Sequence, residues 1–120
     1  MVKKYLKKII AQSPQDLQVI SACCEGGKIK IDDIKYLPKN KIFLFLIERI
    51  AREKENPKEK VKSIVKFEYI EKSKSKNIDR TKVDSFVELA AINLFKKNKN
   101  YEITLLFSDN GIITLTAEIV

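Results

Sequence analysis

The chain has 120 residues and a formal net charge of +8, and 44% of its residues are hydrophobic. This length and composition predict one domain, residues 1–120, whose core needs neither a metal nor a disulfide to hold it. No window reaches the roughly 18 apolar residues of a membrane span, and the basic N-terminus lacks the apolar region of a signal peptide, so we expect a cytoplasmic protein.

The sequence contains no histidine, which excludes Ser-His and Cys-His nucleophile pairs and the commonest metal ligand. Its positive charge is almost entirely lysine, because arginine occurs only as Arg49, Arg52 and Arg80. Arginine is the residue that forms bidentate hydrogen bonds with phosphates and with the edge of guanine. The basic charge therefore has two explanations that stay open: the composition that an AT-rich genome produces, and selection for an anionic partner.

The first two elements are a strand and a helix. Residues 3–11 can form a strand with apolar side chains on both faces. Ser13 suits an N-cap, Pro14 the first helical position, and Gly26-Gly27 the end of the helix. The apolar stripe expected on this helix consists of Leu17, Ile20 and Cys24.

After the helix the apolar period changes to two. Residues 29–36 predict a strand whose parity flips at Asp32-Asp33, which indicates a bulge or a kink. A turn at 38–41 leads into Ile42–Ile47, where both parities are apolar. We interpret this run as a central strand covered on both faces, with the helix as the candidate to cover the second face.

The second half of the chain is dominated by β patterns. A charged loop at 51–60 precedes a strand at 61–76 that has one solvent-exposed, lysine-rich face and one apolar face. The apolar face is expected to carry Val61, Val65, Phe67 and Tyr69. Residues 85–97 fit a strand or a helix, and we favour a strand. The last segment predicts a hairpin around Asp109-Asn110-Gly111.

These elements predict an α+β fold. It is a single, curved antiparallel sheet of six or seven strands, joined mostly by hairpins, with one N-terminal helix packed on it. A partly closed barrel is the alternative, because such sheets curl to hide their edges.

The stretch from Ser13 to Glu53 resembles a known family. A D-L-x-V-I-S-A helix is followed by a D-I-x-aromatic-L-P turn and a long apolar strand, and Ile78-Asp79 and a glycine-centred hairpin come later. In these features the chain is similar to a small alphaproteobacterial family catalogued as a domain of unknown function, number 2948 of that series. The matched polar positions, whose role is unknown, are Asp16, Ser21, Asp33, Arg49, Glu53 and Asp79.

The chain also departs from that family. The strand of its relatives commonly ends in Asn-Arg-Phe followed by Trp-Glu, of which this sequence keeps only Arg49 and Glu53. Relatives continue for a further strand-length segment beyond the hairpin, which implies a trimmed C-terminus here. The resemblance implies a cytoplasmic bacterial protein and brings no activity with it.

No residue set carries the signature of a catalytic, cofactor or metal site. Cys23-Cys24 lacks the further ligands of a zinc site, and we interpret it as an apolar pair on the packing face of the helix. Asp32-Asp33 lacks calcium-loop spacing, so a role in local backbone bonding is expected. Arg49-Glu53 and Asp79-Arg80 are interpreted as structural ion pairs, and we expect no bound cofactor.

Two classes of function follow. The first is a non-enzymatic interaction module that binds a protein partner or a second copy of itself. A weak binder of nucleic acid or another anion is a special case, and its expected face is a row of lysines on one parity of residues 61–76: Lys62, Lys66, Lys72, Lys74 and Lys76. The second is an enzyme of unrecognised type with a pocket near Arg49 and Asp79, which the missing histidine disfavours.

Overall fold

A computed structural model of the chain describes residues 6–11, 14–50, 60–97 and 100–118. The predicted N-cap at Ser13, residues 51–59 of the charged loop predicted at 51–60, and the family-matched Glu53 lie outside these residues. In chain order the elements are β1 (Leu6–Ala11), α1 (Pro14–Cys24), β2 (Lys28–Leu37), β3 (Ile42–Ile50), β4 (Lys60–Phe67), β5 (Ile70–Lys76), β6 (Phe86–Lys97), β7 (Asn100–Phe107) and β8 (Ile112–Ala117).

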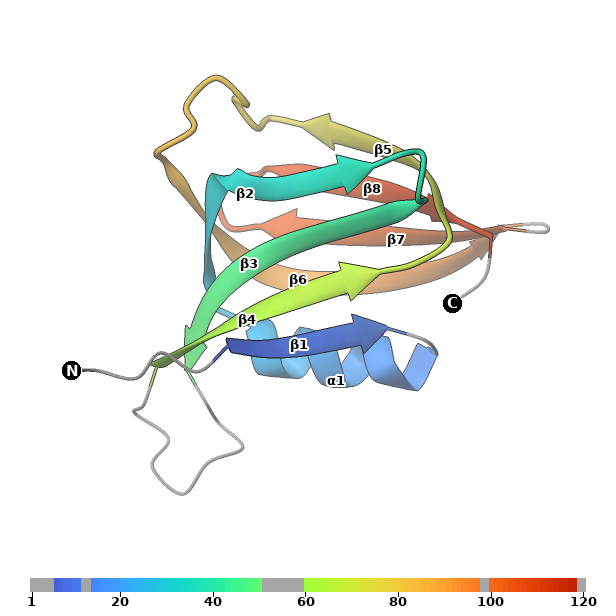
Figure 1. Cartoon of the computed structure of the whole chain (residues 1–120), viewed down its shortest axis with the longest axis horizontal. Helices are drawn as coiled ribbons and strands as arrows, with labels where there is room; N and C mark the ends of the chain where they lie inside the picture. Colours follow the sequence, from blue (N-terminus) through green and yellow to red (C-terminus); the bar gives the residue numbers. More distant parts are fainter. Residues whose placement is uncertain (1–5, 12–13, 51–59, 98–99, 119–120) are drawn as a thin grey trace.

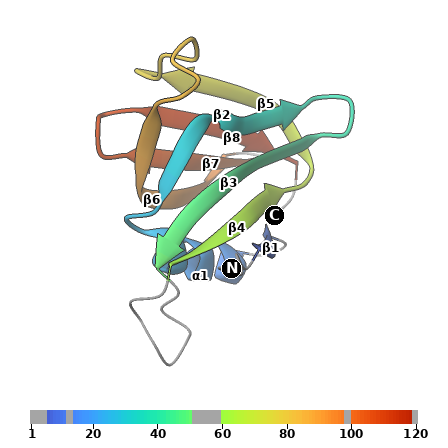
Figure 2. The same ribbon diagram turned by 60° about the vertical axis from the view of Figure 1, so that its left-hand side comes forward.

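The strands form one sheet in the order β1-β4-β3-β2-β6-β7-β8-β5, which Figure 2 shows curling around a common interior. The pairs are antiparallel except for β1 and β4, which are parallel. Over the described ranges of the chain, the predicted class, a curved antiparallel sheet with one helix packed on it, is correct except that the pairing of β1 with β4 is parallel. Within the described residues the sheet is not closed, because β1 and β5 stand at opposite ends of the strand order.

The helix packs on the sheet as expected, but not where it was expected. The predicted stripe of Leu17, Ile20 and Cys24 is buried, and it belongs to the same core as Phe43 and Phe45 of β3. Figure 1 shows α1 alongside β1 at one end of the curled sheet. The helix therefore fills the interior and does not cover the second face of β3.

Backbone hydrogen bonds attach the C-terminal end of the helix to β6. The Gly26 N–H donates to the Leu89 carbonyl at 2.8 Å, and the Leu89 N–H donates to the Gly27 carbonyl at 2.9 Å. Gly26 has a φ of +79°, which glycine adopts without strain. At Gly27 a Cβ atom would lie 2.5 Å from Cδ1 of Ile47, so only glycine allows β3 to approach this closely.

Strand β3 is interior to the sheet, as predicted, but it is buried on one face only. Phe43, Phe45 and Ile47 point into the core and are almost fully buried. The alternate side chains, Ile42 and Leu44 among them, are half-buried on the outer face. The prediction of a strand covered on both faces is wrong, because the helix that was expected to cover it lies on the inner side.

The predicted strand at 61–76 is divided into β4 and β5. Tyr69 has a φ of +62° and is 49% exposed, so it does not share the buried face with Val65 and Phe67 as expected. Ile70 takes the inward position instead. This break lets β4 pair with β3 while β5 pairs with β8, and the described part of the chain therefore has eight strands where the sequence predicted six or seven.

Two bulges explain the irregular apolar patterns. The pairing of β2 with β3 shifts between Ile29 and Ile34, an irregularity that includes the bulge or kink predicted at Asp32-Asp33. Residues 86–97 are a strand, β6, as favoured, and its register with β7 shifts between Leu89 and Ala91. Because the shift inverts the parity, Val87 and Leu89 before it and Ile92 after it all point inward.

The final hairpin around Asp109-Asn110-Gly111 is confirmed. Residues 108–111 separate β7 from β8, and Asn110 has the positive φ of the loop, +65°. Gly111 is favoured by a close approach of another side chain. A Cβ atom there would lie 2.9 Å from Cγ1 of Ile78, which packs across the end of the hairpin.

The one-sided burial of β3 can be tested with a matched pair of variants. Phe45→Lys should unfold the protein, because an unpaired buried charge costs several kcal/mol against a total stability of about 5–15 kcal/mol. Leu44→Lys should stay folded and lose no more than about 1 kcal/mol, since its side chain can reach water. Urea unfolding followed by circular dichroism measures both, and equal loss in the two variants would contradict one-sided burial.

Candidate functional site

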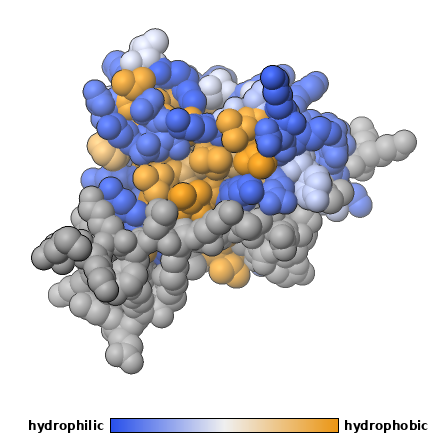
Figure 3. Space-filling view, in the orientation of Figure 1, coloured by the Kyte–Doolittle hydropathy of each residue, from blue (hydrophilic) through white to orange (hydrophobic). Residues whose placement is uncertain are grey.

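The outer face of β3 and β4 carries a patch of apolar side chains. In the register of the two strands Leu46 lies opposite Ile64, and Ile42 and Leu44 continue the row along β3. All four side chains are half-buried, and we call them the outer strip. Figure 3 shows apolar surface in the middle of this face. The residues that the sequence assigned to a doubly covered core thus contribute to the protein surface.

Lysines flank the outer strip on both neighbouring strands. Leu44 pairs with Lys35 of β2 on one side and with Lys66 of β4 on the other. Two residues further along β3, beyond Leu46, Glu48 pairs with Lys28 and Lys62 in the same way. Cross-strand partners on one face lie close enough to act on the same ligand, so the apolar row is bordered by positive charge.

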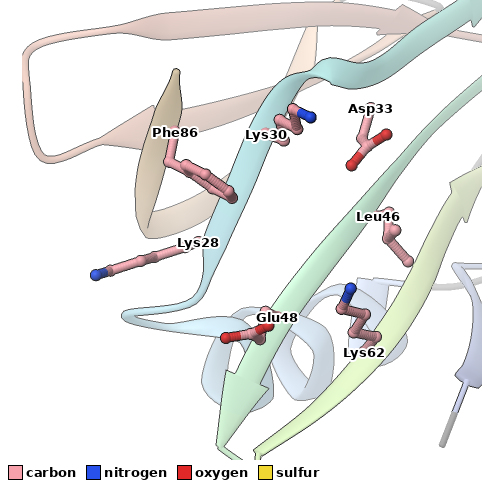
Figure 4. A pocket seen from close by; sticks show the side chains of 7 residues that line it. All are labelled: Lys28, Lys30, Asp33, Leu46, Glu48, Lys62 and Phe86. Carbon is pink, nitrogen blue, oxygen red and sulfur yellow. The ribbon is translucent and has the colours of Figure 1, made fainter. Parts of the chain in front are cut away.

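A hollow of about 290 Å³ lies at the Glu48 end of the outer strip, and Leu46 belongs to both. Side chains from β2, β3, β4 and β6 line this charged hollow, as Figure 4 shows: Lys28, Lys30, Asp33, Leu46, Glu48, Lys62 and Phe86. Phe86 is 58% exposed, a large apolar surface for a phenylalanine. The hollow therefore combines an aromatic ring, three ammonium groups and two carboxylates.

A second hollow, of about 450 Å³, adjoins the first. It shares Lys28, Glu48 and Phe86 with the charged hollow and extends to residues of β6 and of the β7–β8 loop, Ser108 and Asp109 among them. Phe86 thus borders both hollows. Neither hollow is lined by Arg49 or Asp79.

The structure places Arg49 and Asp79 in different environments. Arg49 is 3% exposed and points into the core, where its Nε–H donates to the Ser63 hydroxyl at 3.0 Å. Asp79 is exposed in the loop after β5 and accepts hydrogen bonds from the hydroxyl and the N–H of Thr81, which lower the pKa of its carboxyl. Its neighbour Arg80 donates to the Ile34 carbonyl at 2.9 Å and does not form the expected pair with Asp79.

The other family-matched positions have separate surroundings. The Ser21 hydroxyl accepts a hydrogen bond from the Ile92 N–H at 3.1 Å, which ties α1 to β6 just beyond the bulge. Asp33 is half-buried and lines the charged hollow. Asp16 lies in the first turn of α1, and the placement of its side chain is not described. Ser21 and Asp33, whose side chains are described, therefore do not belong to one site.

The predicted row of five lysines is divided between two strands. Lys62 and Lys66 are half-buried on the outer face of β4, and Lys66 pairs with Glu68 at 3.4 Å. Lys72, Lys74 and Lys76 are exposed on β5, at alternate positions opposite residues of β8. The sequence thus found the lysines but not the break between the two groups.

Phe86 and Glu48 were missed at the sequence level. The parity of β3 could have found Glu48, since it continues the row of Leu44 and Leu46. Phe86 gave no usable signal, because the bulge in β6 hides which side its first residues face. Among the described residues, no group of three or more Cys, Asp or Glu side chains could hold a metal ion, and no helix is long and apolar enough to span a membrane.

In the part of the chain that the structure describes, the protein is built on a mostly antiparallel sheet with one short helix. The chain belongs to the family DUF2948, described as a protein of unknown function, whose model matches residues 7–120. No curated protein and no solved structure gave a significant match. The resemblance seen in the sequence is thereby confirmed, and any function has to be argued from this chain.

The contact between Arg49 and Ser63 predicts a structural role that can be measured. Ser63→Ala should lower the free energy of unfolding by about 1–3 kcal/mol, because it removes one hydrogen-bond acceptor of the buried Arg49 guanidinium. Ser75→Ala, at an exposed position of β5, is the control and should change stability by less than about 0.5 kcal/mol. Similar values for the two variants in urea unfolding would show that the bond contributes little.

Proposed function

We propose that this protein is a non-enzymatic interaction module that binds a partner protein through the outer strip and the charged hollow beside it. The observation that carries this proposal is the exposure of an interior strand. β3 has strands on both sides, and yet Ile42, Leu44 and Leu46 remain half-exposed on its outer face. Contiguous apolar surface bordered by polar residues is typical of protein interaction sites.

An enzyme that uses Arg49 and Asp79 is the weaker proposal. The Arg49 guanidinium is inside the core and bonded to Ser63, while Asp79 is exposed in a loop and its carboxyl pKa is lowered. A general acid or base near neutral pH requires a raised carboxyl pKa and a place beside a substrate. The pair offers neither property. A cytoplasmic location is part of our proposal and fits the buried thiol of Cys24.

One observation favours a second candidate, the binding of an anionic polymer along β5. Lys72, Lys74 and Lys76 are exposed on a strand at the end of the sheet order, and alternate residues of a strand lie about 7 Å apart. Lysines on such a strand also protect it against pairing with other chains. The apolar outer strip has no equivalent structural explanation, which is why the first proposal is preferred.

Site-specific photo-crosslinking in cells tests the preferred proposal. A photoreactive amino acid in place of Leu44 should give a discrete adduct with a partner protein, because that side chain would lie in the interface. The matched control is Ile112, an apolar, half-buried residue of β8. An adduct with a second copy of the chain would identify a homo-oligomer. Absence of an adduct at Leu44, or equal adducts at both positions, would contradict the proposal.

A salt titration tests the second candidate. If β5 binds phosphates, the affinity for single-stranded DNA or RNA, or for anionic vesicles, should fall with salt. For single strands the log-log slope should be about −0.7 per contact. The triple variant Lys72→Gln, Lys74→Gln, Lys76→Gln should then give a slope smaller by about 2 with single strands. A slope that the three substitutions leave unchanged would show that these lysines do not bind the polymer.

A further inference from the structure

We infer that the partner segment that occupies the outer strip is an acidic polypeptide with large apolar side chains, one of which enters the charged hollow. This inference rests on the proposed function and specifies the chemistry of the partner. Three properties of the face lead to it: the position of the lysines, the form of the hollow, and the features that make other occupants unfavourable.

The lysines stand on both sides of the apolar row. Lys35 and Lys66 flank Leu44. Lys28 and Lys62 flank Glu48, which lies two residues beyond Leu46 on β3. A segment that laid apolar side chains along β3 would place its polar side chains over β2 and β4. Carboxylates there would meet ammonium groups, and such complementarity raises the rate of association and the specificity of binding.

The ion pairs that lysines of this face already form do not prevent them from binding carboxylates of a partner. Lys66 bonds Glu68 at 3.4 Å, and Lys30 bonds Asp84 at 3.3 Å. The pair with Asp84 is exposed on both sides and the pair with Glu68 is partly exposed. Pairs of this kind contribute little to stability, so a carboxylate of the partner could replace either acid at low cost.

The charged hollow suits one side chain of the partner. Its volume of about 290 Å³ lies at the lower limit of sites that hold a whole small molecule, about 300 Å³. Leu46 and the exposed ring of Phe86 supply apolar contact on its walls. Lys28 and Lys62 also line it, so a carboxylate next to the anchoring side chain could reach them. Interfaces commonly depend on one such buried anchor.

The outer face also argues against a nucleic acid and against a second copy of the chain. A phosphate backbone would pass over the apolar outer strip, which cannot bind it, whereas a polypeptide can place apolar side chains there. A symmetric dimer through this face would bring the same lysines of two chains together, each chain with a net charge of +8. A segment that is both acidic and apolar avoids both conflicts.

The test is selection of peptides on the intact protein. A displayed library of random 12-residue peptides is enriched on the full chain, and the enriched peptides are synthesised for affinity measurement. We expect them to have a net negative charge and at least one large apolar residue. The double variant Lys35→Glu, Lys62→Glu should weaken their binding at least tenfold. The control Lys72→Glu, Lys74→Glu, which reverses two charges on β5, should change it less than twofold.

Further variants separate failure of this inference from failure of the proposed function. If Leu44→Ser weakens binding and the double variant does not, the outer strip is the docking face but the partner is not chosen by its acidity. If Leu44→Ser has no effect, the peptides bind elsewhere and both proposals fall. Enrichment of neutral or basic peptides, no enrichment, or displacement by a single-stranded oligonucleotide overturns the inference. Thermal melts confirm that each variant is folded.

Discussion

The attachment of α1 to β6 is the constraint on which the rest of the structure depends. Reciprocal backbone bonds join Gly26 and Gly27 to Leu89, and the Ser21 hydroxyl accepts the N–H of Ile92. These contacts keep the apolar stripe of the helix inside the curled sheet, where it completes the core. No second helix of the described chain is left to cover the outer face of β3. The exposed apolar row, and the function proposed for it, follow from this use of the helix.

The sequence predicted the elements whose apolar patterns are regular. The helix stripe and the interior position of β3 were correct because apolar spacing is the dominant local signal. The strand at 85–97 was favoured over a helix although the bulge in β6 makes its pattern irregular. What failed depends on single residues in unusual backbone states. Tyr69 adopts a positive φ, which a non-glycine residue seldom does, and a strand that looked continuous therefore divides. The apolar run of β3 could not reveal whether its second face is covered or open, because the same apolar residues can occur on a covered face and on an exposed binding face.

The candidate site was less predictable, because it depends on which strands become neighbours. The lysines of β4 were recognised by parity, but their role as one border of an apolar row required the pairing of β3 with β4. Phe86 joins the site only because β6 lies beside β2. The family resemblance drew attention to Arg49 and Asp79, but the two residues lie apart. Arg49 contacts Ser63 in the core, and Asp79 lies in an exposed turn.

The central claim is that the outer side chains of β3 and β4 are open to solvent while the inner ones are closed. Paramagnetic relaxation by a soluble gadolinium chelate, read from the methyl NMR signals of the wild-type protein, tests it most directly. The account predicts strong attenuation for Leu44, Leu46 and Ile64 and little for Leu89 and Leu115, which are fully buried. Equal protection of the two groups would show that the outer face is covered and would contradict the account.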